Sequence, residues 1–158
     1  MDHVITFTAI GIPRPKGNLV GIRVGNRCAV TEAAKHSKLL KPWMAELRRA
    51  AFPHLRGEPM TGPLEVDVEF RFPRPANPIC ESHPLGTEAD VDKLQRAVGD
   101  ALQRTIRKGR LVFAGLWKDD KQIVTWIARK RFGSPGATIT VRPLGPEPEQ
   151  LNMYKETA

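Results

Sequence analysis

The stretch LEVDVEFRF, residues 64–72, limits the possible folds more than any other part of the chain. Its five apolar residues occupy every second position, and charged residues fill the positions between them. Because successive side chains of a strand point to opposite faces of a sheet, this alternation predicts a strand with one buried and one polar face. Strands of this kind are typical of antiparallel sheets.

Other segments are expected to supply partner strands. Alternating or β-branched residues predict strands at residues 3–12, 122–131 and 137–141. A Gly-Asn turn signal predicts a short hairpin over residues 19–30. Residues 73–89 contain four prolines and are expected to form a long irregular loop.

Residues 31–51 have the composition of a helix, and Trp43, Leu47 and Ala50–Ala51 can share one apolar face. Pro42 interrupts this pattern, because proline lacks an N–H and clashes with the preceding helical turn. Either a short helix ends near Leu40 and a second begins at Pro42, or a single helix is kinked there.

A second helix is expected directly after the sequence EADVD, residues 88–92. Val91, Leu94, Val98 and Ala101–Leu102 recur at helical spacing, so this helix should pack one face on the core. Lys93, Arg96 and Asp100 lie towards its other side. The sequence RKGR, residues 107–110, is expected to end the helix.

Helices and strands thus alternate without regular βαβ spacing. This order predicts an α+β fold, a small mixed or antiparallel sheet with helices packed on one face. We expect one domain over residues 1–142. Residues 143–158 contain three prolines and no periodicity, which is typical of a mobile tail.

The formal net charge is +8, and its distribution is uneven. Residues 1–60 and 101–158 each carry a net charge of +6, whereas residues 61–100 carry −4. A basic surface attracts polyanions by neutralising phosphates, and carboxylates inside such a surface repel them unless a cation lies between. This distribution suits a metal-dependent nucleic-acid enzyme, although an ordinary basic protein with scattered acids would show it too.

Asp90 and Asp92 begin the second predicted helix. One aspartate there is explained as an N-cap, since Asp92 can accept hydrogen bonds from the first helical amides. Two neighbouring carboxylates repel each other unless a cation neutralises them, and Mg²⁺ prefers one or two carboxylates with water and phosphate oxygens. The pair therefore indicates either a cap with a charged neighbour or half of a metal site.

Asp119 and Asp120 precede the strand at residues 122–131 and form either an ordinary turn or a source of a third carboxylate ligand. Arg96 lies one turn after Asp92, where it makes either a surface ion pair or a contact with a phosphate. The loop RPKG, residues 14–17, is either a solvated turn or a phosphate clamp.

No apolar run approaches the roughly 20 residues that span a bilayer, and the N-terminus lacks the pattern of a signal peptide. We therefore expect a soluble cytoplasmic protein without a membrane partner. Cys28 and Cys80 match no metal-binding spacing and are expected to be reduced thiols.

Taken together, DVDKLQRAVGDALQ and LWKDDKQIV resemble the RusA family of Holliday-junction resolvases of bacteria and their phages. The opening FTAIGIPRPKGN is similar to that family's first strand and its G-x-P-x-P-K-G loop. The chain departs from the family pattern at three positions. Lys93 replaces an asparagine, Ala89 replaces a frequent proline, and Arg96 stands where the family has an essential lysine.

The resemblance implies a Mg²⁺-dependent endonuclease, with Mn²⁺ as a possible substitute, that cuts four-way DNA junctions as a symmetric homodimer. It assigns Asp90, Asp92 and Asp120 as catalytic metal ligands and Arg96 as the catalytic cation. The backbone of the DNA would be contacted by basic side chains, for which the candidates are Arg14, Lys16, Lys93, Lys121, Arg129 and Lys130.

Two other functions remain open at this stage. A non-catalytic nucleic-acid-binding protein would need only the charge distribution. An acid–base hydrolase would use two carboxylates as glycosidases do, and the basic flanks argue against it.

Overall fold

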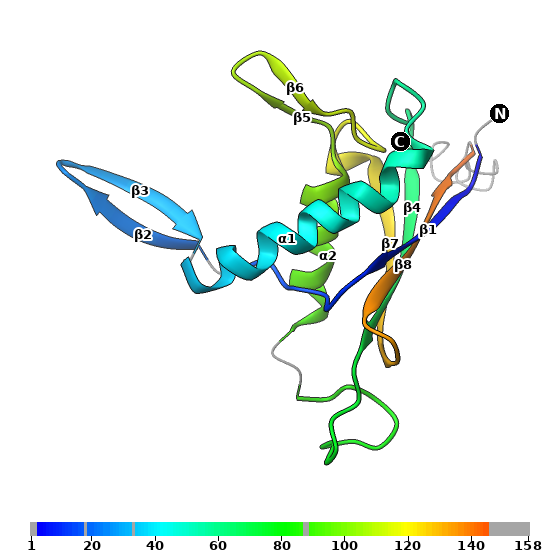
Figure 1. The fold of residues 1–158 in the computed structure, drawn as a ribbon. Coiled ribbons are helices and arrows are strands. Elements are labelled where there is room, and N and C mark those ends of the chain that lie inside the picture. Colours follow the sequence, from blue (N-terminus) through cyan, green and yellow to red (C-terminus); the bar gives the residue numbers. More distant parts are fainter. Residues whose placement is uncertain (1–2, 18, 33, 87–88, 146–158) are drawn as a thin grey trace, which may run out of the picture.

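The computed structural model of the protein describes residues 3–17, 19–32, 34–86 and 89–145 (Figure 1). The elements in chain order are β1 (Ile5–Ile10), β2 (Leu19–Val24), β3 (Arg27–Glu32), α1 (Ala34–Ala51), the 3-10 helix η1 (Phe52–His54), β4 (Leu64–Phe72), α2 (Val91–Leu102), β5 (Thr105–Arg107), β6 (Arg110–Phe113), the 3-10 helix η2 (Asp120–Gln122), β7 (Ile123–Phe132) and β8 (Gly136–Pro143).

Four strands form the main sheet, in the order β1-β8-β4-β7. β8 is antiparallel to both of its neighbours, β1 and β4, whereas β4 and β7 run parallel. The predicted α+β fold with a mixed sheet is confirmed. The expectation that residues 64–72 pair in antiparallel fashion is correct for β8 and wrong for β7, because alternation reports one buried face and carries no information on strand direction.

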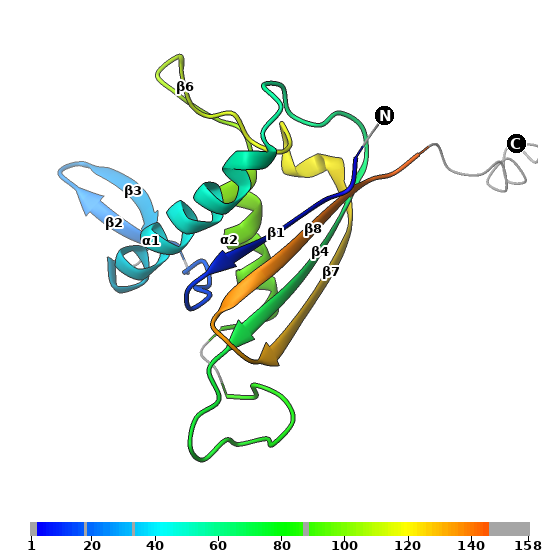
Figure 2. The same cartoon turned by 45° about the vertical axis from the view of Figure 1, so that its right-hand side comes forward.

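The core lies between one face of this sheet and the two helices (Figure 2). All five apolar side chains of β4 are buried, as the alternation predicts. From α1, Trp43, Leu47 and Ala51 are buried against them, and α2 contributes its own apolar face. Burial on this scale is the main force that orders the fold.

The other face of the sheet is covered by ion pairs between neighbouring strands. Glu65, Asp67 and Glu69 of β4 alternate with its buried residues and face arginines of β7 and β8. Arg129 of β7 donates to Asp67 at 2.8 Å, and Arg142 of β8 donates to Glu65 at 2.7 Å. Opposite charges on adjacent strands stabilise the pairing and keep this face polar.

α1 continues as a single helix through Pro42. Of the two alternatives for this region, the structure therefore shows one helix rather than two. Pro42 is exposed, so the carbonyl group that loses its partner in the preceding turn can be solvated.

Two hairpins project from the body of the protein (Figure 1). The β2–β3 hairpin was expected. The β5–β6 hairpin was not, and the prediction that RKGR ends the second helix is wrong, because α2 ends at Leu102. Lys108 and Gly109 have φ values of 48° and 73° and form the two-residue turn of this hairpin, between the paired Arg107 and Arg110.

β8 extends to Pro143, one residue into the segment expected to be a tail, and residues 146–158 lie outside the described part of the chain. No helix within the described ranges combines the length and apolar character needed to cross a bilayer. Cys28 and Cys80 are free thiols.

Substitution of Leu94 by alanine should destabilise the protein by about 2–5 kcal/mol, because the side chain is 0% exposed in the interface between α2 and the sheet. The same change at Leu111, which is 55% exposed on β6, should cost less than about 0.5 kcal/mol. Chemical denaturation of both variants measures the difference. Equal losses of stability would contradict this placement of the core.

Candidate active site on α2

The candidate catalytic residues lie along one face of α2. Asp92, Arg96 and Asp100 follow one another at intervals of four residues, so their side chains leave the helix on the same side. The opposite side carries the buried residues that hold α2 on the core. Packing of the apolar face thus fixes which way the three charged side chains point.

Asp90, rather than Asp92, occupies the N-cap position of α2, and its side chain makes no capping hydrogen bond. Its Oδ2 instead lies 2.9 Å from Nζ of Lys93. This hydrogen-bonded ion pair lowers the pKa of Asp90, and Lys130 adds to the effect. The expectation that Asp92 caps the helix is wrong, and Asp92 is an exposed residue of the first turn.

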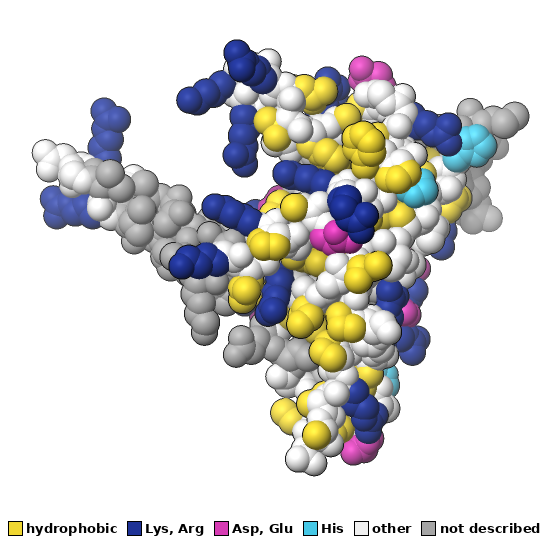
Figure 3. Space-filling view, viewed as in Figure 1, with side chains coloured by type: hydrophobic (Ala, Val, Ile, Leu, Met, Phe, Trp, Pro, Cys, Tyr) yellow, Lys and Arg dark blue, Asp and Glu magenta, His cyan; other side chains and the backbone are white. Residues whose placement is uncertain are grey.

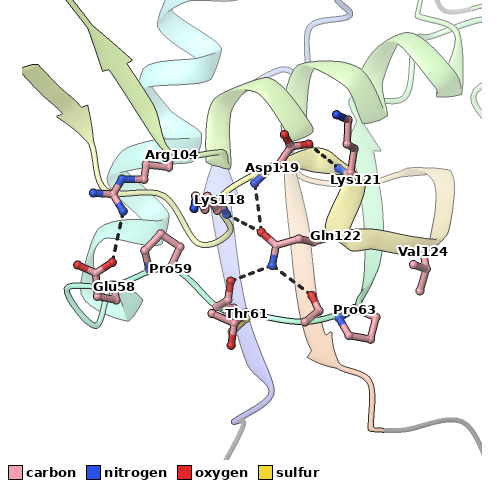
Figure 4. Close-up of a pocket in the computed structure, with 12 residues that line it drawn as sticks. Glu58, Pro59, Thr61, Pro63, Arg104, Lys118, Asp119, Lys121, Gln122 and Val124 are labelled. Carbon is pink, nitrogen blue, oxygen red and sulfur yellow. Dashed lines mark hydrogen bonds and ion pairs between the residues drawn. The ribbon is translucent and has the colours of Figure 1, made fainter. Parts of the chain in front are cut away.

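The short segment before β7 is held by hydrogen bonds of the Asp119 and Gln122 side chains (Figure 4). Asp119 caps η2, because its Oδ1 accepts a hydrogen bond of 2.9 Å from the Lys121 amide. The Gln122 side chain makes four hydrogen bonds, two accepted from the amides of Lys118 and Asp119 and two donated to the carbonyls of Met60 and Gly62. The two aspartates thus form a turn before β7, as one of the two alternatives for this pair expected.

Asp120 lies against α2 rather than in the strand that follows it. Nε1 of the buried Trp117 donates a hydrogen bond of 2.8 Å to Asp120 Oδ1. A Cβ atom added at Gly99 would lie 3.0 Å from Asp120 Oδ2. The absence of a side chain at Gly99 thus lets the carboxylate approach the helix backbone, on the face that carries Asp92, Arg96 and Asp100.

Lys16 completes this group from the loop after β1. Its Nζ is ion-paired with Asp100, and its backbone amide donates to the Lys93 carbonyl at 3.0 Å. The RPKG loop therefore packs on α2 and is not simply a solvated turn. Lys16 brings a positive charge to the part of the helix where two carboxylates, Asp100 and Asp120, lie near each other.

The pKa of Asp120 is raised above that of an ordinary aspartate, chiefly because the carboxylate is partly buried. The Trp117 hydrogen bond opposes this shift, whereas the charges of Asp100 and Asp119 increase it, and Lys16 offsets them only in part. Asp120 is thus a carboxylate whose charge lacks full compensation from the protein itself.

Among the described residues, no three Asp, Glu, His or Cys side chains converge closely enough to hold a metal ion. Asp120 contacts α2 at Gly99, which is roughly two helical turns from Asp92. The donors nonetheless suit Mg²⁺, which takes oxygen ligands and completes its shell with water and phosphate. The raised pKa of Asp120 points the same way, because a cation would supply the missing charge compensation.

The structure divides the other basic candidates. Lys130 lies on the helix side of the sheet, where its Nζ donates to the Ala89 carbonyl at 3.2 Å, just before Asp90. Arg129 is on the opposite face, bonded to Asp67, so the sheet separates it from α2. The two neighbours in sequence therefore present their side chains on opposite faces of the sheet.

Arg14 and Lys121 border hollows in the surface. Arg14 lines one of about 320 Å³ beside α1. Lys121 and Asp119 line a larger one of about 720 Å³, shown in Figure 4. Asp120 does not line the larger hollow, which lies on the other side of the segment before β7 and is separate from the face of α2.

Three residues of this site were not identified from the sequence, namely Gly99, Asp100 and Trp117, and the contact of the candidate Lys16 with α2 was not foreseen. Asp100 carried a detectable signal, because it follows Asp92 and Arg96 at the same four-residue interval. The contacts of Gly99 and Trp117 with Asp120 depend on how the chain folds back on itself, and spacing alone does not reveal them.

The sequence of residues 11–142 matches the family described as endodeoxyribonuclease RusA. A comparison with curated proteins found no match. The family match includes the RPKG loop, the whole of α2 and the segment before β7. The protein therefore falls in a class of endonucleases.

The chain belongs to the RusA family, which implies activity on Holliday junctions, and the resemblance inferred from the motifs is confirmed.

Because the pKa of Asp120 is raised in the folded protein, folding becomes less favourable as the pH rises from the ordinary value for aspartate through the raised one. Asp120→Asn keeps the acceptor for Trp117 and does not titrate. In EDTA the variant should therefore be more stable than the wild type at neutral pH, and the two stabilities should converge in acid. Denaturation across a pH series tests this, and a wild type that is the more stable at neutral pH would refute it.

Proposed function

We propose that the protein is a Mg²⁺-dependent endonuclease that resolves four-way DNA junctions. The observation that carries this proposal is the contact of Asp120 with the face of α2 that presents Asp92, Arg96 and Asp100. A partly buried carboxylate with insufficient compensating charge, beside further carboxylates and cations, is suited to a metal ion and a phosphodiester. Family membership supplies the substrate class.

Asp90, Asp92 and Asp120 are the proposed ligands of the ion. When bound, Mg²⁺ supplies a water of lowered pKa and a Lewis acid for the phosphodiester. Lys93 holds Asp90 in its ionised form, as the lowered pKa of that carboxylate supports. Trp117 fixes the orientation of the Asp120 carboxylate through its 2.8 Å hydrogen bond.

Arg96 is proposed to bind the scissile phosphate. Its place between Asp92 and Asp100 on the same helical face puts a guanidinium group beside the proposed ligands. The planar guanidinium can donate two parallel hydrogen bonds to phosphate oxygens, so arginine can stabilise developing negative charge where the family has lysine. It cannot act as a proton donor, because it stays charged.

Contacts with the DNA backbone are proposed for Lys16, Lys93 and Lys130 at α2, and for Arg14 and Lys121 beside the two surface hollows. Arg129 is a weaker candidate, because it pairs with Asp67 on the other side of the sheet. A homodimer would place two sites about a two-fold axis, which matches the symmetry of a four-way junction and paired nicks in opposed strands. Such a reaction would serve recombination, repair or phage DNA processing in the cytoplasm of a bacterial or phage-infected cell.

Asp92→Asn and Asp120→Asn should each abolish Mg²⁺-dependent cleavage of a synthetic four-way junction while leaving junction binding intact. EDTA should abolish cleavage by the wild type. Asp119→Asn is the matched control, because asparagine also serves as a cap and the side chain lies outside the proposed ligand set. Gel analysis of cleaved and bound junctions measures both properties.

Failure of the wild type to cut junctions with Mg²⁺ or Mn²⁺ would refute the proposal and leave a non-catalytic DNA-binding protein. Equal losses of cleavage in the Asp119 and Asp120 variants would show that the turn as a whole, rather than the Asp120 carboxylate, is what matters.

Gly99→Ala should have a small effect on stability and a large effect on junction cleavage. Alanine should favour the helix by about 1 kcal/mol, which offsets part of the crowding against Asp120. The new methyl group nevertheless displaces the Asp120 carboxylate by a few tenths of an ångström, so junction cleavage should fall by roughly tenfold or more. Cleavage rates and melting curves of the same preparation test this. Full activity would show that Asp120 need not lie close to α2.

A further inference from the structure

A hollow of about 370 Å³ lies where α1, the end of α2 and β5 meet. Three arginines from three separate segments line it, Arg48 from α1, Arg104 from the link after α2, and Arg107 from β5. We call it the arginine hollow. Its lining also includes Asp100, the residue that pairs with Lys16 on the catalytic face of α2. The arginine hollow therefore adjoins the candidate active site.

Arg48 is held in place before any ligand arrives. Its Nε donates a hydrogen bond of 2.9 Å to the Ala101 carbonyl, and its guanidinium carbon lies 5.3 Å from the centre of the Phe113 ring. Partial burial lowers the pKa of Arg48, and the charge of Arg107 lowers it further. Two like charges are thus held near each other, which costs free energy that an anion between them would recover.

Arg104 supplies an unused donor. Its backbone amide is fixed by a 2.8 Å hydrogen bond to the Trp117 carbonyl. Its Nε is buried and has no hydrogen-bond partner among the described residues. Its terminal Nη1 lies 3.3 Å from the carboxylate of Glu58, outside the arginine hollow. A buried donor without an acceptor is unfavourable, and an anionic ligand would satisfy it only after a movement of the Arg104 side chain.

The charge around this region is strongly positive. Asp100 is the one acidic residue that lines the arginine hollow, and Lys16 already neutralises it. Figure 3 shows further Lys and Arg side chains gathered where α1 faces the β5–β6 hairpin. Guanidinium groups favour phosphate over other anions, since a planar guanidinium can offer paired donors to two phosphate oxygens.

We propose that the arginine hollow binds a backbone phosphate of the DNA strand that is cut, next to the scissile phosphate. The inference rests on the proposed nuclease function, because Asp100 links the arginine hollow to the face of α2 that would carry the reaction. A strand held at both places would be fixed in direction and register. Phosphate contacts of this kind position DNA without reading its bases.

The test measures binding of a labelled four-way junction in EDTA, where no cleavage occurs, over a range of salt concentrations. Arg107→Gln removes an exposed arginine of the arginine hollow, so the fold should be unaffected. Each phosphate contact contributes about 0.9 to the slope of log affinity against log salt concentration. The slope should therefore become shallower by about one in this variant.

Arg131→Gln is the matched control. Its side chain is 59% exposed and pairs with Glu69 on the opposite face of the sheet, so its loss should leave the slope unchanged. Equal slopes for wild type, Arg107→Gln and Arg131→Gln would overturn the proposal. Binding of inorganic phosphate that depends on Arg107 while the junction slopes stay equal would also overturn it, because the arginine hollow would then take a free anion.

Replacement of single phosphates in the junction by neutral methylphosphonates locates the contact. Wild-type affinity should fall when a phosphate beside the nick is replaced, and Arg107→Gln should lose this sensitivity at the same phosphate. Retained sensitivity would overturn the proposal. The cleavage assay and the salt slopes test two different proposals. A protein that never cuts junctions refutes the nuclease function. A protein that cuts but shows equal slopes refutes only the role of the arginine hollow.

Discussion

The parallel pairing of β4 with β7 is the constraint on which the site depends. Parallel neighbours cannot be joined by a tight hairpin, so the chain after Phe72 must return to the other end of the sheet before Ile123. That crossover carries the long loop, α2, the β5–β6 hairpin and η2 (Figure 2). The crossover begins at β4 and ends at the adjacent strand β7. Its last segment, η2, therefore returns to lie against α2. Asp120 therefore meets a helix that begins about thirty residues earlier in the chain.

The site gains its electrostatic character at some cost to stability. Trp117 draws Asp120 into a partly buried position, and Gly99 gives up helix propensity to make room for it. Neither arrangement favours folding on its own, and the nearby charges of Asp100 and Asp119 add repulsion. Protein residues with such uncompensated charge cluster at functional sites, because a ligand that supplies the missing charge is then bound in preference to water.

The sequence predicted the features that depend on local pattern. It missed those that depend on the direction of a strand or on contacts between segments distant in the chain. Alternation at residues 64–72 identified every buried position of β4, and helical spacing placed Leu94 and Val98 in the core. It could not reveal that β7 runs parallel to β4. The β5–β6 hairpin was missed because its Lys-Gly turn resembles the end of a helix. In the site, the four-residue spacing joined Arg96 to Asp92, whereas the pairing of Lys16 with Asp100 spans 84 residues of sequence and left no local signal.

The positions of the acidic residues decide which surface carries the excess positive charge of the protein. On the outer face of the sheet, the carboxylates of β4 are matched by Arg129, Arg131 and Arg142, so this face carries little excess charge. The excess must therefore lie elsewhere, and α1 and the β5–β6 hairpin carry basic side chains with few acidic partners. A polyanion is attracted to the helical side of the protein for this reason, and only there does it meet Asp120. Pairing of charges on the sheet thus leaves the helical side as the more positive one, and a positive surface attracts a polyanion before any specific contact forms.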